Sequence, residues 1–68
     1  MSVYKVIELI GTSEKSWEDA AAQAVAKARS SLRELRIVEV KKLDMKLDET
    51  GDIVCYRARL NVSFKYED

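Results

Sequence analysis

In the segment 52–66, DIVCYRARLNVSFKY, one set of alternating positions from Val54 onward is apolar and the other is mostly polar. Such alternation is typical of an antiparallel strand that rests one face on a hydrophobic core. A strand of this length needs a partner strand and a cover for its apolar face, and these two needs limit the possible folds. The apolar set is Val54, Tyr56, Ala58, Leu60, Val62, Phe64 and Tyr66.

The segment 36–47, RIVEVKKLDMKL, predicts the partner strand. Its apolar residues change phase, from even positions at Val38 and Val40 to odd positions from Leu43 onward. An extra residue at Lys41–Lys42 restores a common face, so the pattern predicts a β-bulge there. The turn 48–52, DETGD, contains Gly51, which readily adopts a positive φ. The predicted cross-strand pairs are Leu47–Val54, Met45–Tyr56, Asp44–Arg57, Leu43–Ala58, Val40–Leu60 and Val38–Val62.

A further strand and a helix precede this hairpin. Residues 2–10, SVYKVIELI, are β-branched and aromatic and end at Gly11, as expected for a strand. Ser16 is the predicted helix N-cap, followed by acidic residues in the first turn. The predicted apolar helix face consists of Trp17, Ala20, Ala21, Ala24, Val25, Ala28 and Leu32.

The order of elements predicts an α+β fold, βαββ, in one domain spanning residues 1–68. A three-stranded antiparallel sheet of order 1-3-2 wraps around the single helix, with a right-handed crossover between the first two strands. The third strand is roughly 45 Å long and the helix roughly 24 Å, so the hairpin extends beyond the helix. We expect its uncovered part, with Met45, Val54 and Tyr56, to pack against another copy of the chain.

The composition of this 68-residue chain excludes several functions. One cysteine forms no internal disulfide, and the absence of histidine removes the commonest general base and transition-metal ligand. The net charge of zero argues against nucleic-acid binding, and no segment is apolar enough to span a membrane. We expect no signal peptide, a cytoplasmic location and a non-enzymatic role. Because so small a domain buries little surface, we expect a homo-oligomer.

The sequence resembles the dodecin family in three segments: YKVIELIGTSEKSWEDAAAQAVAKA, LRELRIVEV and VSFKYED. Together they cover nearly the whole chain. The resemblance implies a hollow shell of twelve copies with helices outside and the other face of the sheet lining the interior. It also implies flavin binding, in pairs, for storage or quenching; some members bind coenzyme A.

Three positions that match the family's flavin site differ in this chain. Ile37 stands where flavin-binding members typically carry a stacking tryptophan, and isoleucine offers no π surface. Arg57 replaces a glutamine that pairs with the flavin through a donor and an acceptor, whereas arginine only donates. Asp44 replaces an arginine frequent in the family. We therefore expect a dodecameric shell that binds a small ligand or ion through an absent or altered flavin site.

Several alternatives remain open on sequence alone. The unaltered family function, storage of riboflavin or FMN, is one. A second is calcium binding by the acidic set Asp44, Asp48, Glu49 and Asp52, multiplied by symmetry axes because calcium requires six to eight oxygen ligands. Arg57 and Arg59 either bind an anion or pair with Asp44 and Glu39 between copies. A small adaptor domain is the last alternative, and Trp17 is expected to serve packing.

Overall fold

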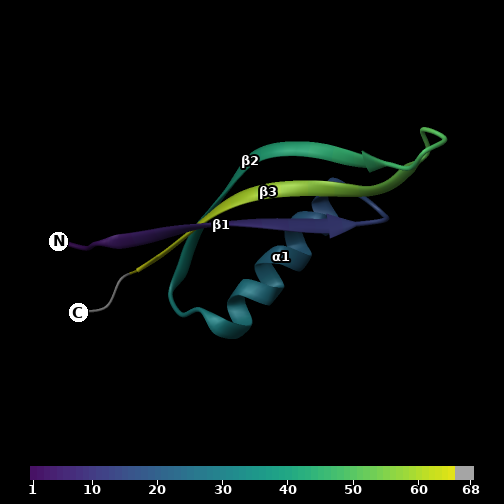
Figure 1. Cartoon of the computed structure of the whole chain (residues 1–68). Helices are drawn as coiled ribbons and strands as arrows, with labels where there is room; N and C mark the ends of the chain where they lie inside the picture. Colours follow the sequence, from purple (N-terminus) through teal and green to yellow (C-terminus); the bar gives the residue numbers. More distant parts are fainter. Residues whose placement is uncertain (66–68) are drawn as a thin grey trace.

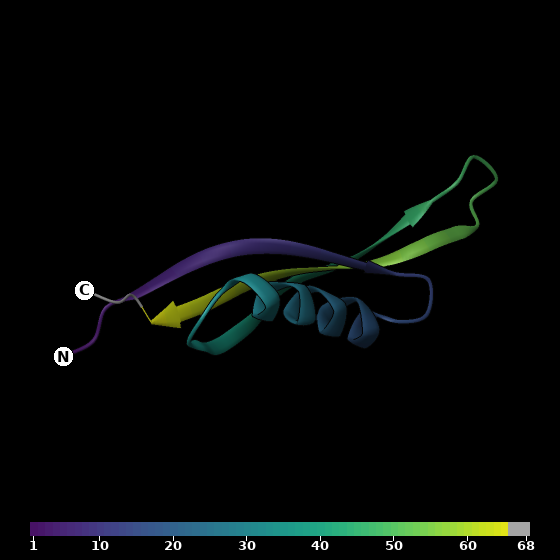
Figure 2. The ribbon, with the colours of Figure 1, turned by 90° about the horizontal axis from the view of Figure 1, so that it is seen from below.

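The computed structural model describes residues 1–65 and confirms the predicted βαββ, α+β fold. Its elements are β1 (Tyr4–Ser13), α1 (Trp17–Ser31), β2 (Leu35–Leu47) and β3 (Ile53–Lys65). The three strands form an antiparallel sheet in the order β1-β3-β2, and α1 lies against one face of it (Figures 1 and 2). Within residues 1–65, no helix has the length and apolarity needed to cross a membrane.

The helix begins at the predicted cap. The Ser16 hydroxyl accepts a hydrogen bond from the Asp19 backbone N–H at 3.0 Å, which satisfies one free donor of the first turn. Asp19 accepts hydrogen bonds from the hydroxyl of Ser13 and the side-chain amide of Gln23, and these lower the pKa of its carboxyl. The end of β1 and the start of α1 are therefore tied together.

The buried core is small and lies between α1 and the centre of the sheet. Small side chains on the helix allow it to approach β1 and β3 closely, and these two strands carry most of its contacts. Along β3, buried apolar residues alternate with half-buried polar residues, as predicted from the sequence. Among residues 1–65, the buried apolar side chains are Ala20, Ala24, Ala28, Ala58, Leu60 and Val62.

The prediction that the first strand ends at Gly11 is wrong. It pairs with Ala58, and β1 continues to Ser13. A Cβ atom built on Gly11 would lie 2.1 Å from the carbonyl oxygen of Ala20. The glycine is therefore required by the close packing of strand on helix rather than by a turn.

The hairpin register confirms five of the six predicted pairs, including Asp44–Arg57, and the bulge between Val40 and Lys42. The prediction that Leu47 faces Val54 is wrong, because Leu47 faces Ile53 across a second irregularity. The turn causes the slip: the Asp48 N–H donates to the Asp52 carbonyl at 2.9 Å, which aligns the residues beside it. A third shift, between Leu35 and Ile37, was not predicted.

The end of the hairpin extends beyond the first turn of α1, as expected from the lengths (Figures 1 and 2). Met45 and Val54 are exposed there. Tyr56 was predicted to be uncovered, and this is wrong. It is half-buried and packs edge-on against the Trp17 ring, with 5.1 Å between ring centroids. Trp17 thus serves packing, as expected. Tyr66, predicted to continue the apolar face of the third strand, lies outside the described residues.

Candidate functional site

The three positions that we expected to match the family's flavin site lie on the face of the sheet opposite α1, which we call the outer face. On β3 this face consists of Cys55, Arg57, Arg59, Asn61 and Ser63, each half-buried and alternating with core residues. Asp44 and Ile37 occupy the matching face of β2, opposite Arg57 and Ser63. The alternation along β3 therefore separates a largely polar, partly exposed face from the core.

Asp44 and Arg57 form a two-point ion pair on the outer face. Arg57 Nε donates to Asp44 Oδ1 at 2.7 Å, and Arg57 Nη2 donates to Asp44 Oδ2 at 3.2 Å. The hydrogen bond from Arg57 is the main reason that the pKa of the Asp44 carboxyl is lowered, and the same contact raises the pKa of the guanidinium. The pair forms within one chain, where the predicted hairpin register places the two residues opposite each other.

Nearby charges and one hydrogen bond from α1 also act on Asp44. Lys42 faces Arg59 in the neighbouring row, and both positive charges also lower the pKa of Asp44. On the helix side, the Trp17 indole Nε1 donates to the backbone carbonyl of Asp44 at 3.0 Å. The backbone of Asp44 is therefore fastened to α1 while its carboxylate is held by Arg57.

Ile37 does not lie near this pair within one chain. Its position opposite Ser63 is six residues along β3 from Arg57, which corresponds to roughly 20 Å of extended strand. Its side chain is 63% exposed. The structure thus places Ile37 and Arg57 on one face but does not bring them together.

The remaining acidic candidates lie in the hairpin turn. Asp48 Oδ1 accepts hydrogen bonds from the Thr50 N–H (2.9 Å), the Thr50 hydroxyl (2.7 Å) and the Asp52 N–H (3.0 Å). The hydrogen bond from the Thr50 side chain is the main reason that the pKa of Asp48 is lowered. Gly51 has φ of +92° and completes the turn, and the Thr50 hydroxyl also lies 3.3 Å from Asp52 Oδ2. The turn is a hydrogen-bonded loop carrying three carboxylates.

In a single copy, these acids do not form a metal centre. Among residues 1–65, no three Asp, Glu, Cys or His side chains are grouped as metal ligands. Asp44 is held by Arg57 within the sheet, whereas Asp48, Glu49 and Asp52 belong to the turn. Cys55 is a half-buried free thiol on the outer face.

Sequence reasoning missed three contributors to these sites. Thr50 organises the acidic turn, and the D-x-T spacing is a local signal for such a turn. The indole hydrogen bond of Trp17 and the proximity of Lys42 to Asp44 depend on tertiary geometry, for which the sequence holds no local signal.

Comparisons with known proteins agree on one family. The Dodecin family model matches residues 3–67. The calcium dodecin of Mycobacterium tuberculosis is 55% identical over 65 residues, covering 96% of this chain and 90% of that protein. The dodecin of Thermus thermophilus is 42% identical over 66 residues, covering 97% and 94%.

Solved structures show the same similarity. A crystal structure of a mutant of the Thermus thermophilus dodecin superposes with a TM-score of 0.90, at 41% identity and with both chains fully covered. The crystal structure of the Mycobacterium tuberculosis calcium dodecin, described as calcium-chelating with a calcium-binding site, gives a TM-score of 0.86 at 53% identity, covering 97% of this chain and 93% of that one. The chain therefore belongs to the dodecin family.

Proposed function

We propose that the chain is the subunit of a non-enzymatic, cytoplasmic homododecamer that binds or sequesters a small ligand or ion, and that its flavin site is altered. The observation that carries this proposal is the ion pair between Asp44 and Arg57. In each copy, this ion pair joins Asp44 to Arg57, which are two of the three positions at which flavin-binding relatives would contact their ligand.

The chemistry of these positions is unsuited to a flavin. A flavin ring edge presents both donors and acceptors, and a guanidinium accepts nothing. Arg57 has also committed its Nε and Nη2 to Asp44. Ile37 is exposed but aliphatic, so it gives no offset stacking with an aromatic ring. Without these contacts, flavin binding loses both its orientation and its stacking energy.

The proposal of a shell rests on the surface of the subunit. Within the described residues 1–65, the core contains six buried hydrophobic residues, four of them alanine, while large apolar side chains remain exposed along β2 and the hairpin end. Soluble monomers rarely expose contiguous apolar surface of this kind. Covering it by neighbouring copies supplies the burial that a domain of this size lacks.

Calcium is the second candidate ligand, and the specific observation that favours it is the 55% identity to a protein named calcium dodecin. Calcium prefers carboxylate and carbonyl oxygens in sets of six to eight. A site built from Asp48, Glu49 and Asp52, or from Asp44, would need oxygens from more than one copy. Flavin storage, the third possibility, would require a rebuilt site that does not use a tryptophan or an amide at these positions.

Fluorescence and thermal melting together test the proposal. Titration of riboflavin with the purified protein should leave its emission unquenched, and stoichiometric quenching would show that Ile37 and Arg57 do not prevent flavin binding. If calcium is the ligand, it should raise the melting temperature relative to EDTA, and the rise should disappear in Glu49→Gln or Asp52→Asn. Glu14→Gln, an exposed acid outside the turn, is the control. An unchanged melting temperature with calcium would exclude that ligand.

A further inference from the structure

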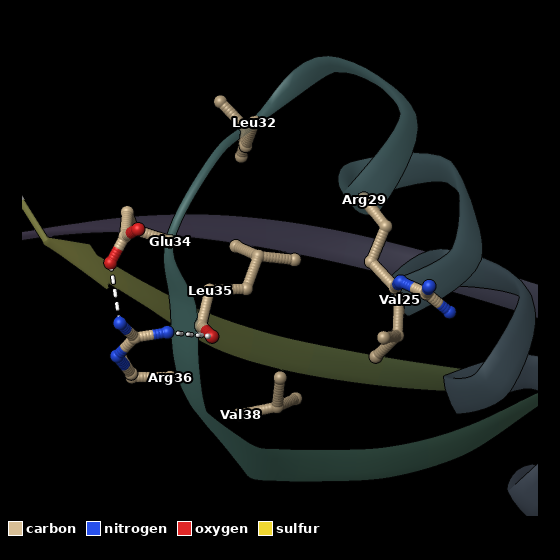
Figure 3. Close-up of a pocket in the computed structure, with 7 residues that line it drawn as sticks. All are labelled: Val25, Arg29, Leu32, Glu34, Leu35, Arg36 and Val38. Carbon is tan, nitrogen blue, oxygen red and sulfur yellow. Dashed lines mark hydrogen bonds and ion pairs between the residues drawn. The ribbon is translucent and has the colours of Figure 1, made fainter.

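The groove between the second half of α1 and the first half of β2 has an apolar floor (Figure 3). At its rim, Glu34 and Arg36 form an ion pair with each other (Figure 3). This groove belongs to the exposed apolar surface that neighbouring copies cover under the proposed function. A group of positive charges lies elsewhere, on the outer face of the sheet.

The bulge in β2 brings two consecutive lysines against one arginine of β3. Val40 faces Leu60, and after the bulge Lys42 faces Arg59 on the outer face. Lys41 is the extra residue between them. A bulge of this kind sets two residues of one strand opposite a single residue of its neighbour. Lys41, Lys42 and Arg59 therefore form a group of three cations, which we call the basic cluster.

The basic cluster is not neutralised within the subunit. Among residues 1–65, none of its three side chains makes an ion pair or a hydrogen bond. The pKa of Asp44 is lowered mainly by the hydrogen bond from Arg57 and less by the charges of Arg59 and Lys42. Asp44 therefore lies near the cluster, but its carboxylate is already held by Arg57.

The other acids on this face also leave the cluster unpaired. Glu39 of β2 and Glu8 of β1 both face Asn61, which is the row next to Arg59. Neither acid forms an ion pair among the described residues. On β1, Arg59 faces Ile10, which carries no charge. Because like charges directly opposite each other destabilise a sheet, the pairing of Lys42 with Arg59 favours a bound counterion.

The chemistry of the cluster suits a compact oxyanion. A guanidinium is planar and donates two parallel hydrogen bonds to the oxygens of one phosphate or carboxylate group, and an ammonium adds a point charge. Arg59 is half-buried, which limits the positions of its side chain, whereas Lys42 is exposed and can reach over the anion. The neighbouring Ile10 offers no stacking surface for a ring. A doubly charged phosphate group matches the local excess of positive charge better than a carboxylate.

We propose that the basic cluster binds a phosphate group on the outer face of the sheet, with Arg59 and Lys42 contacting its oxygens and Lys41 adding to the positive potential. This inference deepens the proposed function and rests on it, because it names an oxyanion as the class of small ligand or ion that is bound. The three cations of the cluster are not among the positions expected to match the flavin site, nor do they belong to the acidic turn.

Calorimetric titration with inorganic phosphate, at constant ionic strength and in the presence of EDTA, tests the site. The wild type should bind phosphate saturably. Arg59→Gln and Lys42→Gln should each weaken binding by about tenfold or more, because each removes a charge-assisted hydrogen bond. Lys46→Gln removes an exposed lysine of the same strand outside the cluster and should bind phosphate like the wild type.

A variant that adds no new contact covers the case in which the cluster variants unfold. Glu39→Gln removes a negative charge beside the cluster and should tighten phosphate binding, since the local positive potential rises. Unchanged or weaker binding in an assembled Glu39→Gln would contradict a site controlled by these charges. Glycerol 3-phosphate in the same titration identifies the source of the group: binding at least as tight as that of phosphate assigns the site to a phosphate ester, and weaker binding assigns it to free phosphate.

The outcomes separate this inference from the proposed function. Light scattering on each sample reports the assembly. An assembled wild type that shows no saturable phosphate binding, or variants that all bind phosphate equally, overturns the phosphate site and leaves the shell intact. A wild type that is monomeric at micromolar concentration but binds phosphate through Arg59 and Lys42 contradicts the shell and not the site.

Discussion

Asp44 and Arg57 face each other across β2 and β3 and are joined by two hydrogen bonds of 2.7 and 3.2 Å. The pair lies on the outer face, where relatives that bind flavin would carry an arginine and a glutamine. Two positions of the proposed flavin site are thus engaged in a contact internal to the subunit.

Restoring the three family residues should restore flavin binding. The variant Ile37→Trp/Asp44→Arg/Arg57→Gln regains a π surface and an amide that both donates and accepts. We expect it to quench riboflavin fluorescence in a saturable titration, in contrast to the wild type. The control carries Ile37→Leu with the same two other changes. If the restored variant assembles but leaves emission unchanged, these positions do not decide flavin binding.

The acidic side chains should make stability dependent on pH. The pKa values of Asp19, Asp44 and Asp48 are lowered in the fold, so the folded state binds fewer protons than the unfolded chain near the ordinary carboxyl value of 3.8. Their stabilisation is complete above about pH 5 and is lost as the pH falls through the lowered values. The melting temperature should fall below pH 4, and less steeply in Asp44→Asn. A melting temperature independent of pH between 2 and 6 would contradict these shifts.

Gly11→Ala should destabilise the fold by about 2–4 kcal/mol, because the added Cβ has no space. It would lie 2.1 Å from the Ala20 carbonyl oxygen and 3.0 Å from the Ala24 Cβ. Chemical denaturation at one fixed protein concentration measures the change. Gly51→Ala is the comparison: its Cβ would meet nothing within 4 Å, and its φ of +92° should cost only about 1–2 kcal/mol. Equal losses at the two glycines would show that packing at Gly11 is not the cause.

Much of the fold followed from the sequence because the alternation along β3 permits few registers. The phase change at Lys41 predicted the bulge, and that register in turn predicted the Asp44–Arg57 pair. The slip at Leu47 was not predictable from apolar spacing, because a backbone hydrogen bond within the turn sets it. The continuation of β1 through Gly11 was also not predictable from the sequence, because it depends on how closely α1 approaches the strand.

The candidate site was predictable only where it follows strand register. The distance between Ile37 and Arg57 along one face follows from strand geometry once the register is known. The groove between α1 and β2 depends on the sideways position of the helix over the sheet, which strand register does not give.

Glu34→Gly should stabilise the subunit by about 0.5–1 kcal/mol. Glu34 adopts φ of +61°, a left-handed conformation that favours glycine. Its ion pair with Arg36 is exposed on both sides and offsets little of this strain. Thermal denaturation compares the variant with Glu39→Gly, an exposed strand position at which glycine should destabilise. A lower melting temperature for Glu34→Gly would contradict the strain.

Native mass spectrometry of the purified protein, with riboflavin and calcium added, tests the central claim most directly because one spectrum reports both assembly and bound ligand. The account predicts a species of twelve times the 7.8 kDa chain mass that carries no flavin. A smaller assembly, or a dodecamer with stoichiometric riboflavin bound, would contradict it.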